Sequence, residues 1–197
     1  MKFRNIRSLW VRGALAVSIL PALAGCDDDL NQDWVAVPDT VQLYSLSRPE
    51  LIGQPSAFDF FNALGAGVSG IPVIVEDPGA SGRWDVAVTD VSGGLALAPA
   101  GAFVGLTSRA GIATVTGSTL EEFGRAPSDT SRYSSAAVPL EAGKLYVVRS
   151  RRESCGFSSG SKYAKLEVLE TNPTTGTVRF RAITNPYCND RRLIPPE

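Results

Sequence analysis

The sequence predicts an all-β fold: a single antiparallel β-sandwich or barrel-like domain with a C-terminal three-stranded meander and at most one or two short helices. Short apolar or alternating runs, about nine in roughly 150 residues, lie between stretches rich in Gly, Pro, Ser and Asp. No long segment has the 3.6-residue period of a helix. The 197-residue chain is long enough to bury the core of one such domain.

The expected strands follow one another between residues 41 and 184, separated by turn-forming residues. They are Val41–Leu46, Ala57–Phe61, Pro72–Glu76, Trp84–Thr89, Leu95–Ala98, Ile112–Thr116, Leu145–Arg149, Tyr163–Glu170 and Val178–Thr184. One short helix is expected near residue 120, because Ser118-Thr119-Leu120-Glu121 fits a capping box and Pro127 marks a stop.

The last three strands form the clearest part of this pattern. Tyr163–Glu170 and Thr177–Thr184 flank the loop 171–176, whose Asn, Pro and Gly residues favour a turn. An antiparallel hairpin would stack their apolar faces and place Glu167 opposite an arginine. Leu145–Arg149 is expected to precede them as the first strand of an up-down-up meander.

The N-terminus has the layout of a secretory signal. A basic region without acids comes first, an apolar run from Gly13 to Leu23 follows, and this run is shorter than a membrane span. The segment Leu23-Ala24-Gly25-Cys26 resembles the bacterial lipobox, which implies lipid transfer to the Cys26 thiol and cleavage before it. The alternative is an ordinary cleaved signal with a coincidental cysteine.

These features predict three parts: a lipoprotein signal peptide over residues 1–25, a flexible tether over 26–40 and a β-rich domain over 41–197. The tether is expected because residues 26–40 are acidic and polar. The lipid on Cys26 would hold the protein to a membrane outside the cytoplasm, on the periplasmic side or at the cell surface. Whether the inner or the outer membrane is used stays open.

Composition removes several classes of function. The signal takes four of the 19 basic residues and no acid, so the mature chain has 15 basic and 20 acidic residues and a net charge of −5. This charge argues against general binding of nucleic acids. The chain has no histidine, and its one methionine is Met1. We therefore expect no histidine-dependent triad, no metal site and no cofactor.

The cysteines predict one disulfide bond. Once Cys26 carries lipid, Cys155 and Cys188 remain, and the exported compartment is oxidising. Cys155 follows the first meander strand and Cys188 follows the third, so both would lie at the same edge of the sheet. Two separate buried thiols are the alternative.

Two short motifs resemble catalytic or cofactor-binding signatures. Gly65-Ala66-Gly67-Val68-Ser69-Gly70 matches the dinucleotide fingerprint, but a strand and not a helix is expected after it. Ser159-Gly160-Ser161-Lys162 matches the nucleophile motif of penicillin-recognising enzymes, but it lies in a Gly- and Ser-rich stretch before a strand. Both are interpreted as loops.

Acidic pairs give no better indication of catalysis. Asp85 with Asp90, or Glu121 with Glu122, could meet other carboxylates in space, yet neither pair has the apolar enclosure that raises a pKa. We interpret them as solvated surface acids. No catalytic residue is therefore assigned, and the chain is expected not to be an enzyme.

The candidate binding residues are arginines that follow the first and third meander strands. If the disulfide forms, these arginines would converge at one edge and suit carboxylates, phosphates or a partner protein. The alternative is a solvated rim, with arginines paired to Glu153 and Asp190. The five residues are Arg149, Arg151, Arg152, Arg191 and Arg192.

Two stretches resemble the HmuY-like family of lipid-anchored, all-β haem-binding proteins. One is Trp84-Asp85-Val86-Ala87, and the other is Tyr146-Val147-Val148-Arg149 followed by Tyr163-Ala164-Lys165-Leu166. The resemblance implies the fold and the anchoring. It does not imply haem binding, because the family's best-known haem ligands are histidines and this chain has none.

These observations favour a lipid-anchored envelope protein whose β domain binds a small ligand or another envelope protein. A hydrolase that uses carboxylates or serine is one alternative, and a structural component of the envelope is another. The expected partners are the membrane, through Cys26, and such a ligand or protein, with no nucleic acid.

Overall fold

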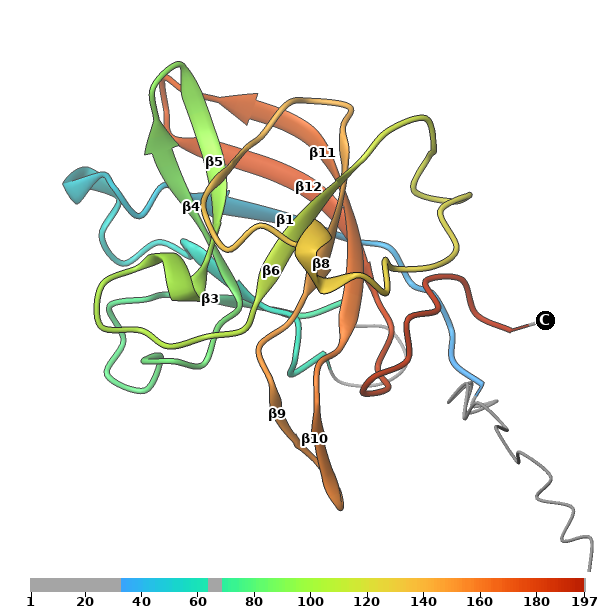
Figure 1. Cartoon of the computed structure of the whole chain (residues 1–197). Helices are drawn as coiled ribbons and strands as arrows, with labels where there is room; N and C mark the ends of the chain where they lie inside the picture. The colour runs from blue at the N-terminus through green and yellow to red at the C-terminus, as the bar shows by residue number, and fades with distance from the viewer. Residues whose placement is uncertain (1–32, 64–68, 197) are drawn as a thin grey trace, which may run out of the picture.

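Two five-stranded antiparallel sheets pack face to face in the computed structural model, which describes residues 33–63 and 69–196 (Figure 1). The first sheet has the order β1 (Asp39–Tyr44), β12 (Thr177–Thr184), β11 (Tyr163–Asn172), β8 (Leu145–Arg149) and β6 (Gly111–Val115). The second has the order β3 (Ile71–Val73), β2 (Ala57–Asp59), β4 (Val86–Val91), β5 (Gly94–Pro99) and β7 (Val138–Pro139). The predicted all-β sandwich is confirmed.

A separate two-stranded hairpin, β9 (Glu153–Cys155) and β10 (Ser158–Gly160), projects from the end of the sandwich opposite the β4–β5 turn (Figure 1). Within the described residues the only helical elements are three single turns of 3-10 helix: η1 (Pro49–Leu51), η2 (Ala100–Ala102) and η3 (Thr130–Arg132). The sequence does not predict β7, β9 or β10, because strands of two or three residues carry no readable alternation.

The main core lies between the two sheets, where alternate residues of each strand point inward. Phe58 of β2 meets Phe180 of the first sheet, with ring centroids 5.6 Å apart, and Phe60, which directly follows β2, lies 4.7 Å from Phe58. Val148 and Leu166 are among the aliphatic side chains that complete this core. The alternation of apolar and polar residues in the sequence therefore reflects strands that turn one face toward this core.

The C-terminal meander is confirmed, because β8, β11 and β12 are neighbours in the first sheet. Glu167 pairs in register with Arg181, and their side chains form an ion pair of 2.6 Å. The register shifts between Val168 and Glu170, a bulge that the sequence does not signal.

The outer face of the first sheet is covered around β6, β8 and β11, whereas Gln42 of β1 and Arg179 of β12 stay exposed. Loop residues Leu120 and Phe123 and the C-terminal Leu193 pack on it. Lys165 of β11, only 1% exposed, lies beneath this cover, and its Nζ donates a hydrogen bond to the carbonyl oxygen of Phe123 at 3.0 Å. Burial lowers the pKa of Lys165 to about 8.

The helix predicted near residue 120 is wrong. The segment forms turns, with one helical hydrogen bond from the Phe123 amide to the Thr119 carbonyl and one from the Glu122 amide to Thr119 Oγ1. Leu120 is fully buried against the sheet, and Gly124 follows at once. Packing on the sheet and the poor helix propensity of glycine stop the turn from propagating.

The N-terminal boundary differs from the prediction as well. β1 begins at Asp39, and Trp34 is buried in a cluster with Leu145 and Ile183. Trp34 and the first residues of β1 thus belong to the domain that was expected to begin at residue 41. The signal peptide and Cys26 lie outside the described residues, as does most of the Gly65–Gly70 loop. No helix in the described part of the chain is long and apolar enough to cross a membrane.

Candidate functional site: an arginine-lined depression beside the disulfide

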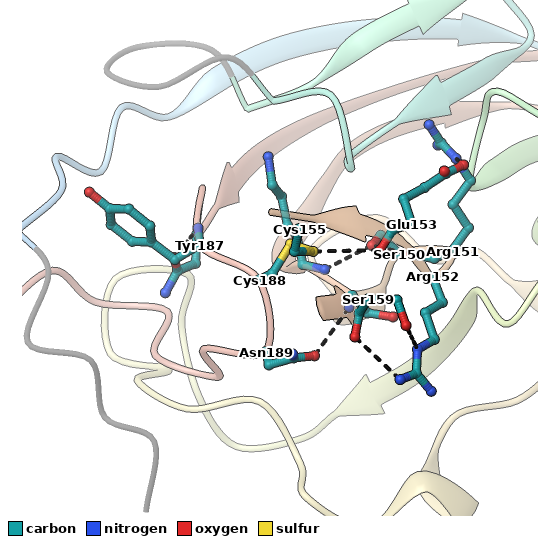
Figure 2. Close-up of a disulfide and its surroundings, with 12 residues drawn as sticks. Ser150, Arg151, Arg152, Glu153, Cys155, Ser159, Tyr187, Cys188 and Asn189 are labelled. Atoms are coloured by element: carbon teal, nitrogen blue, oxygen red, sulfur yellow. Dashed lines mark hydrogen bonds and ion pairs between the residues drawn. A yellow bond between two sulfur atoms is a disulfide. The ribbon is translucent and has the colours of Figure 1, made fainter. Parts of the chain in front are cut away.

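The predicted disulfide between Cys155 and Cys188 is confirmed, with their Cα atoms 6.2 Å apart (Figure 2). Cys155 ends β9, and Cys188 lies in the turn after β12. The alternative of two separate thiols is therefore wrong. The bond ties the projecting hairpin to the C-terminal turn. This agrees with the expectation that the first and third meander strands end at the same edge of the sheet.

Arg151 is a buried structural residue and not part of an exposed patch. Its Nη1 lies 2.7 Å from Asp59 Oδ1 and 3.3 Å from Asp85 Oδ1, and its Nε lies 2.9 Å from Glu153 Oε1. The guanidinium also lies over the Phe61 ring at 5.4 Å. The interpretation of Arg151 as an anion-binding residue is wrong, because three carboxylates of the protein already occupy its guanidinium.

Asp85 is the most constrained of these carboxylates. Its Oδ1 accepts the Arg151 amide, and its Oδ2 accepts the amides of Phe60 and Phe61. Burial raises the pKa of Asp85 to about 6, against the lowering effect of Arg151 and these amides. The carboxylate thus joins the end of β2, the start of β4 and the turn after β8.

The interpretation of Asp85 as a solvated surface acid is wrong, because the side chain is fully buried. The sequence carries no local signal for this burial. Asp85 stands between Trp84 and Val86, and Asp59 stands between Phe58 and Phe60. Because successive side chains of a strand point to opposite faces, an acid between two apolar residues has the pattern of an exposed residue. The burial of Asp85 and Asp59 depends on their contacts with Arg151 from the other sheet.

Two of the predicted arginines line the surface. Arg149 ends β8, lies 5.0 Å over the Tyr133 ring, and donates from Nε and Nη2 to the carbonyl oxygen of Arg109. Arg152 lies directly before β9 and donates from Nε to Ser159 Oγ at 2.8 Å (Figure 2). Both cations are held in place by neutral acceptors, which leaves their positive charge uncompensated.

Arg191 and Arg192 do not join these two. Arg192 pairs with the buried Asp190 at 2.7 Å, as the alternative interpretation of a paired rim expected. Arg191 is half-buried, and its carbonyl accepts the amide of Ala126. Three of the five predicted arginines, Arg149, Arg151 and Arg152, border the depression described next, and of these Arg151 is already engaged by Asp59, Asp85 and Glu153.

The surface is hollowed into two depressions of about 620 and 420 Å³, which share Arg109, Arg152 and Ser159. Arg109, in the loop before β6, is exposed. We call the two together the arginine depression. Sequence reasoning missed Arg109, because only the antiparallel pairing of Gly111 with Arg149 brings it to this edge.

Neutral donors complete the arginine depression. The larger hollow adds Ser108 and Thr107, and the smaller adds Ser161, Tyr163 and Asn189. Among the described residues none of Arg109, Arg149 and Arg152 has an ion pair with a carboxylate. Glu153 also lines the larger hollow, but it is paired with Arg151. The arrangement therefore presents three cations and several hydroxyls to solvent.

The Ser159–Lys162 motif has no catalytic geometry. Ser159 lies in β10 and accepts a hydrogen bond from Arg152. Lys162 Nζ donates instead to the carbonyl oxygen of Ala63 at 3.2 Å. The motif therefore forms the end of a hairpin strand and the turn that follows it, where the sequence predicted a loop.

No known protein family matches the sequence, and no curated protein matches it either. The comparisons thus assign no family to the chain. The resemblances to the lipobox and to HmuY-like proteins stay predictions.

Proposed function

We propose that this protein is a lipid-anchored protein of the bacterial cell envelope that binds an acidic ligand in the arginine depression. The observation that carries the proposal is the meeting of Arg109, Arg149 and Arg152 without carboxylate partners at one edge of a domain whose mature chain has a net charge of −5. Unpaired arginines suit carboxylate and phosphate groups, which accept forked hydrogen bonds.

The size and division of the arginine depression favour a ligand with more than one acidic group. Arg109 and Arg152 line both hollows, while Arg149 lines only the smaller one. A ligand that spans the hollows would meet all three cations, and its neutral parts would meet the serine and threonine hydroxyls. The chemical class is a multiply charged carboxylate or phosphate compound.

The hydrolase alternative gains no support from the acidic residues. Asp59 and Asp85 are buried and engaged by Arg151. Neither carboxylate lines the arginine depression. A general acid or base must reach the substrate, so this pair does not supply one.

The ligand proposal predicts that the double variant Arg109→Gln/Arg152→Gln binds tripolyphosphate at least about tenfold more weakly than the wild type, because two charge-assisted contacts are lost. Isothermal titration calorimetry at low ionic strength measures the affinity, and added salt is expected to weaken the wild-type binding.

The matched control is Lys144→Gln/Arg179→Gln, which changes the net charge equally. Lys144 precedes β8 at the end opposite Arg149, and Arg179 pairs in register with Glu170. The control is expected to bind like the wild type. Equal weakening in both double variants would mean that only the overall charge matters, and no wild-type binding to tripolyphosphate or citrate would overturn the proposal.

The anchoring proposal predicts that Cys26→Ser abolishes incorporation of an alkyne-labelled fatty acid and moves the protein from the membrane to the soluble fraction, because the acyl chains supply the membrane affinity. The variant Cys155→Ser/Cys188→Ser is the control and is expected to keep the label. A Cys26→Ser protein that stays labelled would contradict lipidation at this residue.

A further inference from the structure

The tip of the β9–β10 hairpin carries an aromatic side chain that packs against nothing. Phe157 is fully exposed in the two-residue turn between Cys155 and Ser158, where Gly156 adopts a φ of +74°. The strands beside it contribute only polar or small residues from Glu153 to Gly160. Phe157 therefore adds nothing to the core, and its surroundings in the fold do not explain it.

The hairpin is joined to the place where the chain enters the fold. Tyr187 Oη donates a hydrogen bond to the carbonyl oxygen of Asp33 at 3.0 Å, and the next residue, Cys188, is bonded to Cys155 of the hairpin. Tyr187 is itself held by a hydrogen bond from its amide to Asn185 Oδ1 at 2.8 Å. One hydrogen bond and one disulfide thus link Asp33, the first described residue, to the end of β9 beside the hairpin turn.

This link brings the hairpin to the side of the molecule from which the lipid would extend. Asp33 is seven positions after Cys26 in the sequence. Seven residues reach at most about 25 Å when fully extended. In Figure 1 the hairpin and the entry of the chain lie at the lower end of the view, and the β4–β5 turn lies at the upper end. A lipid on Cys26 would keep the lower end near the membrane.

We propose that the β9–β10 hairpin is a second membrane contact, in which Phe157 inserts into the headgroup region of the bilayer. The inference rests on the proposed lipidation of Cys26. Aromatic side chains are favoured at the membrane–water interface. The disulfide would keep the hairpin rigid relative to the tether, so that the domain takes one orientation on the membrane.

The same orientation determines what reaches the arginine depression. Ser159 of β10 lines the arginine depression, and so does Arg152, which directly precedes β9 and donates a hydrogen bond to Ser159. An inserted hairpin would hold the arginine depression close to the lipid headgroups, where acidic groups are abundant.

Tryptophan fluorescence on lipidated protein tests this contact. Trp34 and Trp84, the tryptophans of the described residues, are buried, so Phe157→Trp adds a distinct exposed reporter. The control is Ser92→Trp in the exposed β4–β5 turn at the opposite end. Each protein is reconstituted into phosphatidylethanolamine–phosphatidylglycerol vesicles, with and without brominated acyl chains, and compared with the wild type.

The expected result is a blue shift and strong quenching by brominated lipid for Phe157→Trp, with neither change for Ser92→Trp. Flotation of the vesicles separates the two proposals. Protein that floats with the vesicles while Phe157→Trp stays unquenched would overturn the hairpin contact and leave the anchor intact. Equal quenching of both reporters would also overturn it, and failure to float would overturn both proposals.

Discussion

Replacing Arg151 by alanine is expected to lower the free energy of unfolding by about 3–5 kcal/mol, the typical cost of removing one partner from a buried ion pair. The variant leaves Asp59 and Asp85 buried without their cation. It also removes the guanidinium contacts that hold the turn after β8 to Asp59 in β2, while the hydrogen bond from the backbone amide of residue 151 to Asp85 can remain. Urea unfolding followed by circular dichroism measures the change.

Arg152→Ala is the matched control, since it removes the same charge at the neighbouring position. The Arg152 side chain is exposed and bonded only to Ser159, so its loss is expected to cost less than about 1 kcal/mol. If the two variants unfold at the same urea concentration, the buried carboxylates do not depend on Arg151. Because the loss of Arg151 is expected to destabilise the fold, the variants that test ligand binding keep this residue.

The double variant Cys155→Ser/Cys188→Ser is expected to be about 3–4 kcal/mol less stable than the oxidised wild type, because the crosslink lowers the entropy of the unfolded chain. The two cysteines are 33 residues apart in the sequence. Urea unfolding of both proteins, with and without reductant, measures the difference.

Reductant supplies the internal control. It is expected to lower the stability of the wild type towards that of the double variant and to leave the double variant unchanged. A double variant as stable as the oxidised wild type would contradict a stabilising role for the bond. Free thiols at both positions in exported protein, detected by mass spectrometry, would contradict the bond itself.

The sequence predicts the meander and its disulfide because both depend on local alternation and on strand order. Glu167 opposite Arg181, and Cys155 near Cys188, follow from three strands that run up, down and up. The sequence does not predict the cover over the outer face, because alternation indicates a buried inner face alone. Lys165 accordingly has the pattern of an exposed residue while a loop and the C-terminal segment bury it.

The sequence predicts only part of the candidate site, for a related reason. Arg149 and Arg152 follow a meander strand, so the strand order brings them to the edge. Arg109 arrives there through the pairing of β6 with β8, which links segments nearly 40 residues apart. Arg151 stands between Arg149 and Arg152 in the sequence, but its side chain turns inward to Asp59 and Asp85, which belong to the other sheet. Contacts between sheets have no local signature in a sequence.

The most direct test of ligand binding in the arginine depression is a tripolyphosphate titration followed by NMR of the arginine side chains. The Nε–H resonances of Arg109, Arg149 and Arg152 are expected to shift together and saturate, while those of Arg179 and Arg181, which pair with glutamates, stay in place. Shifts of similar size at Arg179 and Arg181, or no shift at the three arginines of the depression, would contradict a binding site there.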